Sequence, residues 1–396
     1  MKKIPKESNY LKPSRLMYDI GISLLCAKEF LNKRVYVEGA EKIPEKGPVL
    51  VLANHTNYID PVYLAYAFHK HTKTGIHLNF MMLPDLFGNN VLSRMVNKLT
   101  NKVNAYQVNR ERITSEQHIF FKKILHDDFL AIFFGGTRSR DGRFNYMLKK
   151  ERPPTGLVHL TELAQKESGN PVKILPVAIT YSILKDVTIT FGHHMIFKGQ
   201  EGIAGHREKR KKFAEDIINN IGRHVKVNLD TIFANYLVQY AANSSSETGK
   251  AVLNAEKCYN DLYSIVNSLS EYSKINLDMA LLNEKYFLDK FSSVSSYFQK
   301  KGIIKPVKCI NYLLDKKTVI SQPHITENKT KEEVKKMGLV ERVRYNKNIR
   351  KISRNLVYNS NKITHLDEVT AEVYKRVKEN YKLNYLSEFK RRNNLI

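Results

Sequence analysis

A histidine and an aspartate lie five residues apart in the segment PVLVLANHTNYIDP, residues 48–61. His55 follows an apolar stretch typical of a buried strand, and Asp60 precedes Pro61 and an apolar helical run. On one straight helix this spacing would place the two side chains about 140° apart, so a turn is needed to bring them together. If they meet, Asp60 can accept the Nδ1 proton of His55, which leaves Nε2 free to take a proton from an alcohol.

Asp60 also has a purely structural interpretation. An aspartate directly before a proline is typical of a helix N-cap followed by proline at the first helical position. The two roles are compatible, so the spacing alone leaves both open.

A second cluster suited to chemistry occupies IFFGGTRSRDGR, residues 132–143. Gly135 and Gly136 would let the backbone approach an anion closely, and the planar guanidinium of Arg138 suits a phosphate. No Gly-Lys-Ser/Thr sequence follows the glycines, so the segment is not a P-loop. Arg140 and Arg143 are either further anion ligands or ordinary surface charges. The segment therefore predicts a phosphate-binding loop.

The elements around these clusters alternate between short apolar runs and helical patterns from Val35 to about Lys198. This alternation predicts an α/β domain over residues 35–200, with a mixed sheet covered by helices. The expected strands are Val49–Ala53, Gly75–Met82, Val103–Val108, Phe129–Phe134, Val172–Ile179 and Val187–Phe191. The expected helices are Val62–Phe68, Ser115–Leu125 and Thr155–Lys166.

The α/β domain has an expected helical segment on each side. In residues 1–34 apolar residues recur at helical spacing, and this amphipathic stripe either packs on the core or lies in a lipid headgroup layer. The stripe consists of Leu16, Met17, Ile20, Leu24, Ala27 and Leu31. Residues 201–396 are expected to be largely helical and basic, with long polar helical patterns over residues 207–221, 247–269 and 277–300. A basic run over residues 335–354 is either a solvated face or a docking surface for lipid or a carrier protein.

Amino-acid composition indicates the cellular compartment and the kind of binding partner to expect. The net charge of +26 favours anionic partners such as acidic lipid, an acidic carrier protein or a phosphorylated substrate. Cys26, Cys258 and Cys309 fit no metal-ligand spacing, so we expect reduced thiols, a cytoplasmic protein and no metal site. We expect neither a signal peptide nor a membrane span, because no apolar stretch approaches the roughly 20 residues that a spanning helix needs.

Four segments, taken in order, resemble the four blocks of the glycerolipid acyltransferases, which acylate glycerol-3-phosphate and lysophosphatidic acid. The first block, N-H-x-x-x-x-D, is matched by Asn54, His55 and Asp60, and the arginine that ends the second block by Arg110. The third block, F-P-E-G-T-R-S, is matched by Phe133, Gly136, Thr137, Arg138 and Ser139. The fourth block is matched by Leu175, Pro176 and Val177. The resemblance covers roughly residues 35–198.

The resemblance implies a direct acyl transfer without metal or bound cofactor. His55, held by Asp60, would deprotonate the acceptor hydroxyl, which attacks the thioester of acyl-CoA or acyl-carrier protein. The acceptor phosphate would be held by Arg138, Gly136, Thr137, Ser139 and Arg110. An apolar groove for the acyl chain would include Phe80, Met81, Met82 and Leu83, a run that equally suits a protein core. The implied location is the surface of an anionic membrane, on which the protein would be peripheral.

The third block departs from the family pattern at two positions, and these departures motivate an alternative. Phe134 replaces the usual proline, and Gly135 replaces the usual glutamate, a carboxylate that helps to shape the acceptor site in the family. The alternative is a catalytically silent homologue that binds phospholipid or acyl-carrier protein. Nucleic-acid binding is suggested only by the charge and the 22 tyrosines, and because the sequence has no aromatic-basic recognition motif we do not expect it.

Overall fold

The chain folds into two compact units in a computed structural model that describes residues 14–30, 33–57, 59–73, 75–82, 104–107, 115–134, 139, 142–144, 156–197, 207–244, 250–307, 311–315 and 356–392. The first, here called the sheet unit, comprises residues 1–138, 147–181 and 185–224, and the second, the helical unit, comprises residues 139–146, 182–184 and 225–396. Residues 207–224, which follow the boundary expected near residue 200, group with the sheet unit.

The sheet unit is built on one mixed sheet with the strand order β1-β7-β6-β2-β5-β3-β4, and β8 pairs with β6. Its strands are β1 (Arg34–Glu38), β2 (Val49–Ala53), β3 (Asn79–Met82), β4 (Ala105–Gln107), β5 (Phe129–Phe133), β6 (Lys173–Tyr181), β7 (Asp186–Phe191) and β8 (Met195–Ile196). The central strand β2 pairs in parallel with β5 on one side and with β6 on the other. The pairs β6/β7 and β6/β8 are antiparallel, which makes the sheet mixed, as the sequence predicted.

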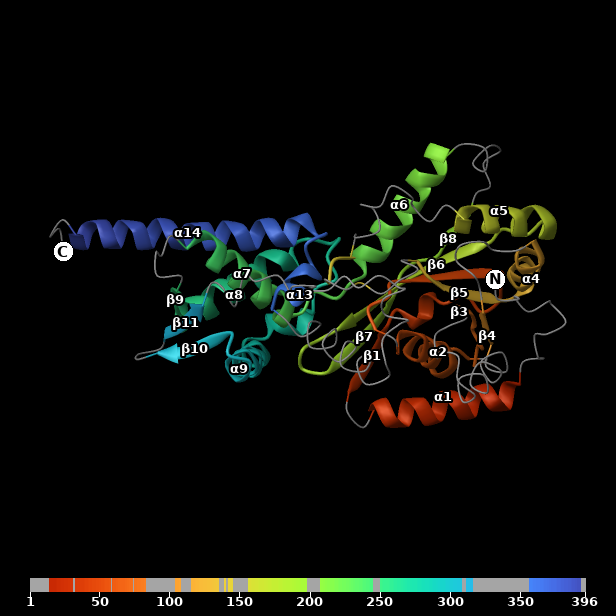
Figure 1. Ribbon diagram of the computed structural model, residues 1–396, viewed down its shortest axis with the longest axis horizontal. Coiled ribbons are helices and arrows are strands. Elements are labelled where there is room, and N and C mark those ends of the chain that lie inside the picture. The colour runs from red at the N-terminus through yellow and green to blue at the C-terminus, as the bar shows by residue number, and fades with distance from the viewer. Residues whose placement is uncertain are drawn as a thin grey trace, which may run out of the picture. The chain divides into compact units, whose positions relative to one another are not determined.

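Helices cover both faces of this sheet (Figure 1). On one face lie α1 (Arg15–Phe30) and α2 (Asp60–His71), and on the other α4 (Ser115–Asp127), α5 (Gly156–Ser168) and α6 (Arg207–Arg223). All five residues of β2 are buried. Because successive side chains of a strand point to opposite faces, β2 contributes to two cores, and Val49, Val51 and Ala53 share a hydrophobic cluster with Phe68 of α2.

The helical unit contains α7 (Leu229–Asn243), α8 (Ala255–Ser270), α9 (Glu284–Lys300), α13 (Leu356–Asn361) and α14 (Asp367–Arg392), with the short 3-10 helix η4 (Met279–Leu282) before α9. It also contains a three-stranded antiparallel sheet of β10 (Ile304–Val307), β11 (Asn311–Asp315) and β9 (Lys250–Asn254). The expected continuous helix over residues 247–269 was therefore wrong, because β9 precedes α8. Ala251 and Leu253 of β9 are buried and alternate with exposed neighbours, a strand period within a segment whose other residues follow a helical one.

Helix α1 presents apolar side chains both to the core and to solvent. Tyr18 and Ile22 are buried, whereas Leu16, Met17 and Ile20 are 68%, 37% and 46% exposed. In the described part of the chain, no helix combines the length and apolarity required to cross a bilayer. The basic run over residues 335–354 lies outside the described residues.

Candidate active site

Three neighbouring strands end at the same edge of the sheet and bring candidate site residues together. Asn54 and His55 follow β2, Phe133 is the last residue of β5, and Tyr181 is the last residue of β6. Because β2 runs parallel to both β5 and β6, their carboxyl ends lie at one edge. Crevices beyond the carboxyl ends of such strands are the usual position of ligand sites in α/β sheets.

The pair predicted from the sequence is in contact at this edge. The Nδ1 atom of His55 lies 2.8 Å from Oδ2 of Asp60. Asp60 is fully buried, whereas the His55 side chain is 17% exposed, so the imidazole has solvent access and the carboxylate has none. The loop between β2 and α2 supplies the turn that the five-residue spacing required, since Asp60 is the first residue of α2.

The buried carboxylate of Asp60 is compensated by further hydrogen bonds. The backbone N–H groups of Thr56 and Asn57 donate to Oδ2 over 2.7 and 2.8 Å, and the Tyr181 hydroxyl donates to Oδ1. An ionised carboxylate only accepts hydrogen bonds, so Nδ1 of His55 must be the donor and Nε2 carries a free lone pair. The N-cap of α2 is Ile59, so the expectation of Asp60 as the N-cap was wrong.

Aromatic rings pack against the face of the His55 imidazole. The ring of His55 stacks on Phe133, with 4.5 Å between centroids and 28° between planes. Phe133 in turn stacks on Phe80 of β3, at 6.5 Å and 10°. Phe80, expected to line an acyl groove, is buried within this stack. Met81 is partly buried, and the side chain of Met82 and all of Leu83 lie outside the described residues.

Asn54 anchors the loop that carries His55. Its Nδ2 donates to the Ile179 carbonyl over 3.0 Å, and its Oδ1 accepts from the Ile179 N–H over 2.7 Å. These two bonds continue the pairing of β2 with β6 by one residue beyond Ala53. Neither this anchoring role nor the contact of Tyr181 with Asp60 was anticipated. Asn54 directly follows the predicted strand Val49–Ala53, and Tyr181 lies two residues beyond the predicted strand Val172–Ile179.

Residues 34–180 match the family model described as Acyltransferase. The match runs from β1 almost to the end of β6 and includes the contact between His55 and Asp60. The match covers less than half of the chain and makes residues 34–180 similar to acyltransferases, so we call them the acyltransferase region.

Comparison of the chain with solved structures gives a more distant likeness. One match is the 1-acyl-sn-glycerophosphate (LPA) acyltransferase PlsC from Thermotoga maritima, with 17% sequence identity and a TM-score of 0.33. The match covers 54% of this chain and 83% of that chain. A search of curated proteins finds no match.

The other predicted site residues of the acyltransferase region are mostly outside the described residues. These are Arg110, Gly136, Thr137 and Arg138. Ser139 is described and groups with the helical unit, where its hydroxyl donates to the Arg143 carbonyl over 3.0 Å. At the second residue of the third block, the Phe134 N–H donates to the Ala53 carbonyl over 3.0 Å, so β5 is still paired with β2 where the block begins.

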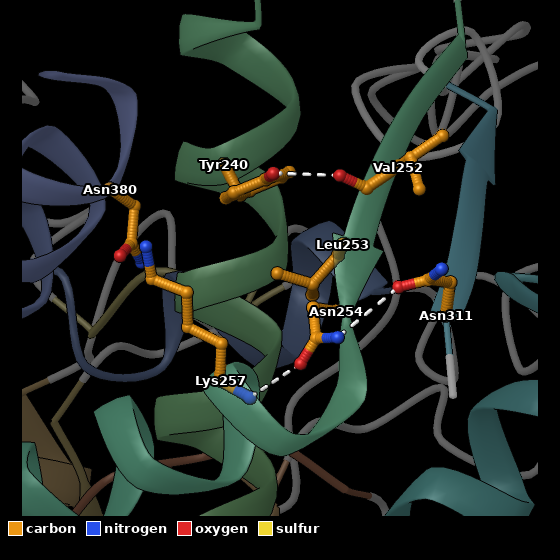
Figure 2. A pocket seen from close by; sticks show the side chains of 7 residues that line it. All are labelled: Tyr240, Val252, Leu253, Asn254, Lys257, Asn311 and Asn380. Carbon is orange, nitrogen blue, oxygen red and sulfur yellow. Dashed lines mark hydrogen bonds between the residues drawn. The ribbon is translucent and has the colours of Figure 1, made fainter. Parts of the chain in front are cut away.

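A pocket of about 160 Å³ lies in the helical unit (Figure 2). It lies among α7, β9, α8 and α14, and its polar groups bond to one another: the Tyr240 hydroxyl donates to the Val252 carbonyl over 2.8 Å, and the Lys257 N–H to Oδ1 of Asn254 over 2.9 Å. None of the site residues predicted from the sequence lines it.

Proposed function

We propose that the acyltransferase region moves a fatty acyl group from acyl-CoA or acyl-carrier protein to the hydroxyl of glycerol-3-phosphate or lysophosphatidic acid. The observation that carries this proposal is the contact between Nδ1 of His55 and the buried carboxylate of Asp60. It leaves Nε2 as a base on a partly exposed ring, which is the group that an alcohol acceptor requires.

The reaction needs only one proton carrier. Nε2 of His55 takes the hydroxyl proton while the acceptor oxygen attacks the thioester carbonyl. When the tetrahedral intermediate collapses, the C–S bond breaks and the imidazolium returns the proton to the departing thiolate. The products are an ester and a free thiol, and His55 is regenerated. Asp60 orients the ring and stabilises the imidazolium, as the carboxylate of a catalytic triad does.

The acceptor phosphate is assigned to the third block on sequence grounds. Arg138, assisted by Arg110 and by Gly136, Thr137 and Ser139, supplies the positive charge and hydrogen-bond donors for that group. The acyl chain is assigned, also from the sequence, to a groove lined by Phe80, Met81, Met82 and Leu83. Direct transfer by this route requires neither a metal nor a bound cofactor.

A peripheral position on an anionic membrane suits these water-insoluble substrates. The solvent-exposed Leu16, Met17 and Ile20 of α1 and the net charge of +26 support this position. Apolar side chains on one helix face insert at the headgroup boundary, and basic charge attracts acidic lipid.

A second candidate function is binding of phospholipid or acyl-carrier protein without turnover. It is favoured by Gly135, which stands where the family has a glutamate. A matrix of acyl-CoA and acyl-carrier donors against glycerol-3-phosphate and lysophosphatidate acceptors separates the two functions. Thiol release and ester formation in the wild-type protein that disappear in His55→Ala support the enzyme.

The same matrix, measured with Gly135→Glu, tests whether the glycine at the position of the family glutamate prevents turnover. Binding of donor or lipid without ester formation for any pair in the wild type supports the silent homologue, and turnover gained in Gly135→Glu would identify the missing carboxylate as the reason.

A further inference from the structure

Three potential metal ligands from separate parts of the sequence lie close together in the sheet unit. Asp19 lies on α1, His69 lies in the last turn of α2, and His77 precedes β3. One ligand atom from each lies within 4.8 Å of the other two. Among the described residues, this is the one group of three histidine, cysteine or acidic side chains with that geometry.

The spacing of these atoms is close to that around a small metal ion. Oδ1 of Asp19 lies 2.8 Å from Nε2 of His77 and 3.6 Å from Nδ1 of His69. Ligands bound tetrahedrally to zinc at about 2.0 Å are about 3.3 Å apart. The two imidazole nitrogens lie within 4.8 Å of each other, so an ion could contact all three atoms after the side chains adjust.

His69 provides an independent reason to expect a ligand. Its Nδ1 atom is buried and forms no hydrogen bond with any residue that the structure describes, since Asp19 is 3.6 Å away. A buried polar atom without a partner is uncommon, because its desolvation is not compensated. A metal ion would complete the coordination of this nitrogen and of the Asp19 carboxylate together.

The surroundings hold the two imidazole rings in place. Tyr18 contacts His77 edge to face, with 4.7 Å between centroids, and its hydroxyl accepts from the Leu78 N–H over 3.1 Å. The rings of His69 and His77 stack at 5.8 Å and 29°. Gly75 adopts a φ of +61°, and a Cβ there would lie 3.4 Å from Nδ1 of His69. The two imidazole rings are therefore held by their neighbours, and the Asp19 carboxylate, 41% exposed, meets them from α1.

We propose that Asp19, His69 and His77 bind a divalent transition-metal ion, with zinc as the best match. Two imidazole nitrogens and one carboxylate oxygen are a common zinc ligand set, and water would fill the fourth position. The ion would fasten α1, which carries the exposed Leu16 and Ile20, to the end of α2.

This site is separate from the His55 site. His69 lies nine residues after Asp60 on α2, about 13 Å along the helix axis. The ion therefore has no part in acyl transfer, and its role is to join elements of the fold.

The test is zinc binding to the full-length, untagged protein after treatment with a chelator. Calorimetry should give one zinc ion per chain, and zinc should raise the melting temperature, since a ligand that binds only the folded state stabilises it. Asp19→Asn, which nearly preserves side-chain shape, and His69→Ala should each weaken binding at least tenfold. His71→Ala, an exposed histidine on the same helix, is the matched control and should bind like the wild type.

Cobalt provides a second readout that needs no variant. Cobalt bound by two imidazoles, a carboxylate and water should give the intense visible absorption of a four-coordinate ion, and zinc should displace it. The absence of saturable zinc binding to the wild type would overturn the proposal, as would equal affinity in Asp19→Asn, His69→Ala and wild type, or a cobalt spectrum identical to that of the aqueous ion. The cluster would then be a hydrogen-bonded contact between α1 and His77.

Discussion

Tyr181 acts on the candidate base only through another residue. Its hydroxyl donates to Oδ1 of Asp60, on the opposite side of the carboxylate from His55. Tyr63 lies against the Tyr181 ring at 6.1 Å, which limits its movement. Tyr181 is therefore a positioning residue in the proposed reaction.

We predict that Tyr181→Phe lowers kcat about tenfold and leaves KM unchanged. The carboxylate loses one donor and holds the imidazole less firmly, but no group that would contact substrate is removed. The unfolding free energy should fall by about 1 to 3 kcal/mol, the usual loss for a hydrogen bond to a charged group. Steady-state kinetics and urea unfolding measure both quantities. Tyr36→Phe, at an exposed position of β1, is the control, and a rise in KM with constant kcat would refute the positioning role.

The contact between His55 and Asp60 could be anticipated from the sequence, whereas the contacts that complete it could not. The five-residue spacing, the preceding strand and the family motif all indicated that pair. Tyr181 reaches Asp60 because β6 pairs with β2 in a register that aligns Val177 with Ala53. No local pattern encodes that register, so the partner could be identified only from the folded sheet.

At the scale of elements, strands with a continuous apolar core were predicted well, whereas the edge strands β1 and β9 were not. Residues 49–53 form β2 as expected, because every side chain is buried. Strand β1, the short segment RVYVE, was missed. It is a strand because it pairs with β7, with Arg34 opposite Asp186, about 150 residues away in the sequence. The same reason applies to β9, whose pairing with β11 joins residues about 60 positions apart. Where stability comes from non-local pairing, sequence periodicity is a weak guide.

The charges of Asp230, which is buried on α7, and of the partly buried Lys362, which follows α13, make the stability of the helical unit depend on pH. Burial lowers the pKa of Lys362 to about 8, and the charge of Asp230 on α7 partly opposes this shift. Burial also raises the pKa of Asp230. The unfolded chain therefore binds more protons at Lys362 than the folded chain between about pH 8 and 10.5.

We predict that the Lys362 contribution to the unfolding free energy is fully present above about pH 10.5 and is lost as the pH falls through about 8. The change should be about 1 to 3 kcal/mol, since Lys362 is only partly buried and solvent screening reduces the value that this shift implies. Chemical unfolding at successive pH values gives the unfolding free energy of wild type and of Lys362→Met, and their difference is the Lys362 contribution. The difference is needed because burial raises the pKa values of Tyr236 and Cys258, and these two groups lower the stability of both proteins as the pH rises. Parallel curves for the two proteins would contradict the prediction, and the exposed Lys378→Met should follow the wild type.

At the scale of the whole molecule, the net charge of +26 and the exposed apolar side chains of α1 should act together on a membrane surface. We predict binding to vesicles that contain acidic phospholipid and much weaker binding to neutral vesicles. Raising the salt from about 0.01 M to 1 M should release the protein, because the screening length falls from about 30 Å to 3 Å.

The apolar contribution is tested by the double variant Leu16→Ser, Ile20→Ser in vesicle sedimentation. It should bind at least tenfold more weakly than the wild type at constant salt, whereas Met279→Ser, an exposed apolar residue of η4, should bind equally well. Equal binding of the double variant would show that charge alone directs the protein to lipid.

The measurement that tests the central claim most directly is single-turnover transfer of a labelled acyl chain from acyl-CoA or acyl-carrier protein to lysophosphatidate or glycerol-3-phosphate, with wild-type protein and His55→Ala compared at equal folded concentration. The account predicts labelled ester in the wild type and a rate lower by about 10² to 10⁴ in His55→Ala, the range expected for loss of a general base. A His55→Ala rate within twofold of a measurable wild-type rate would contradict it.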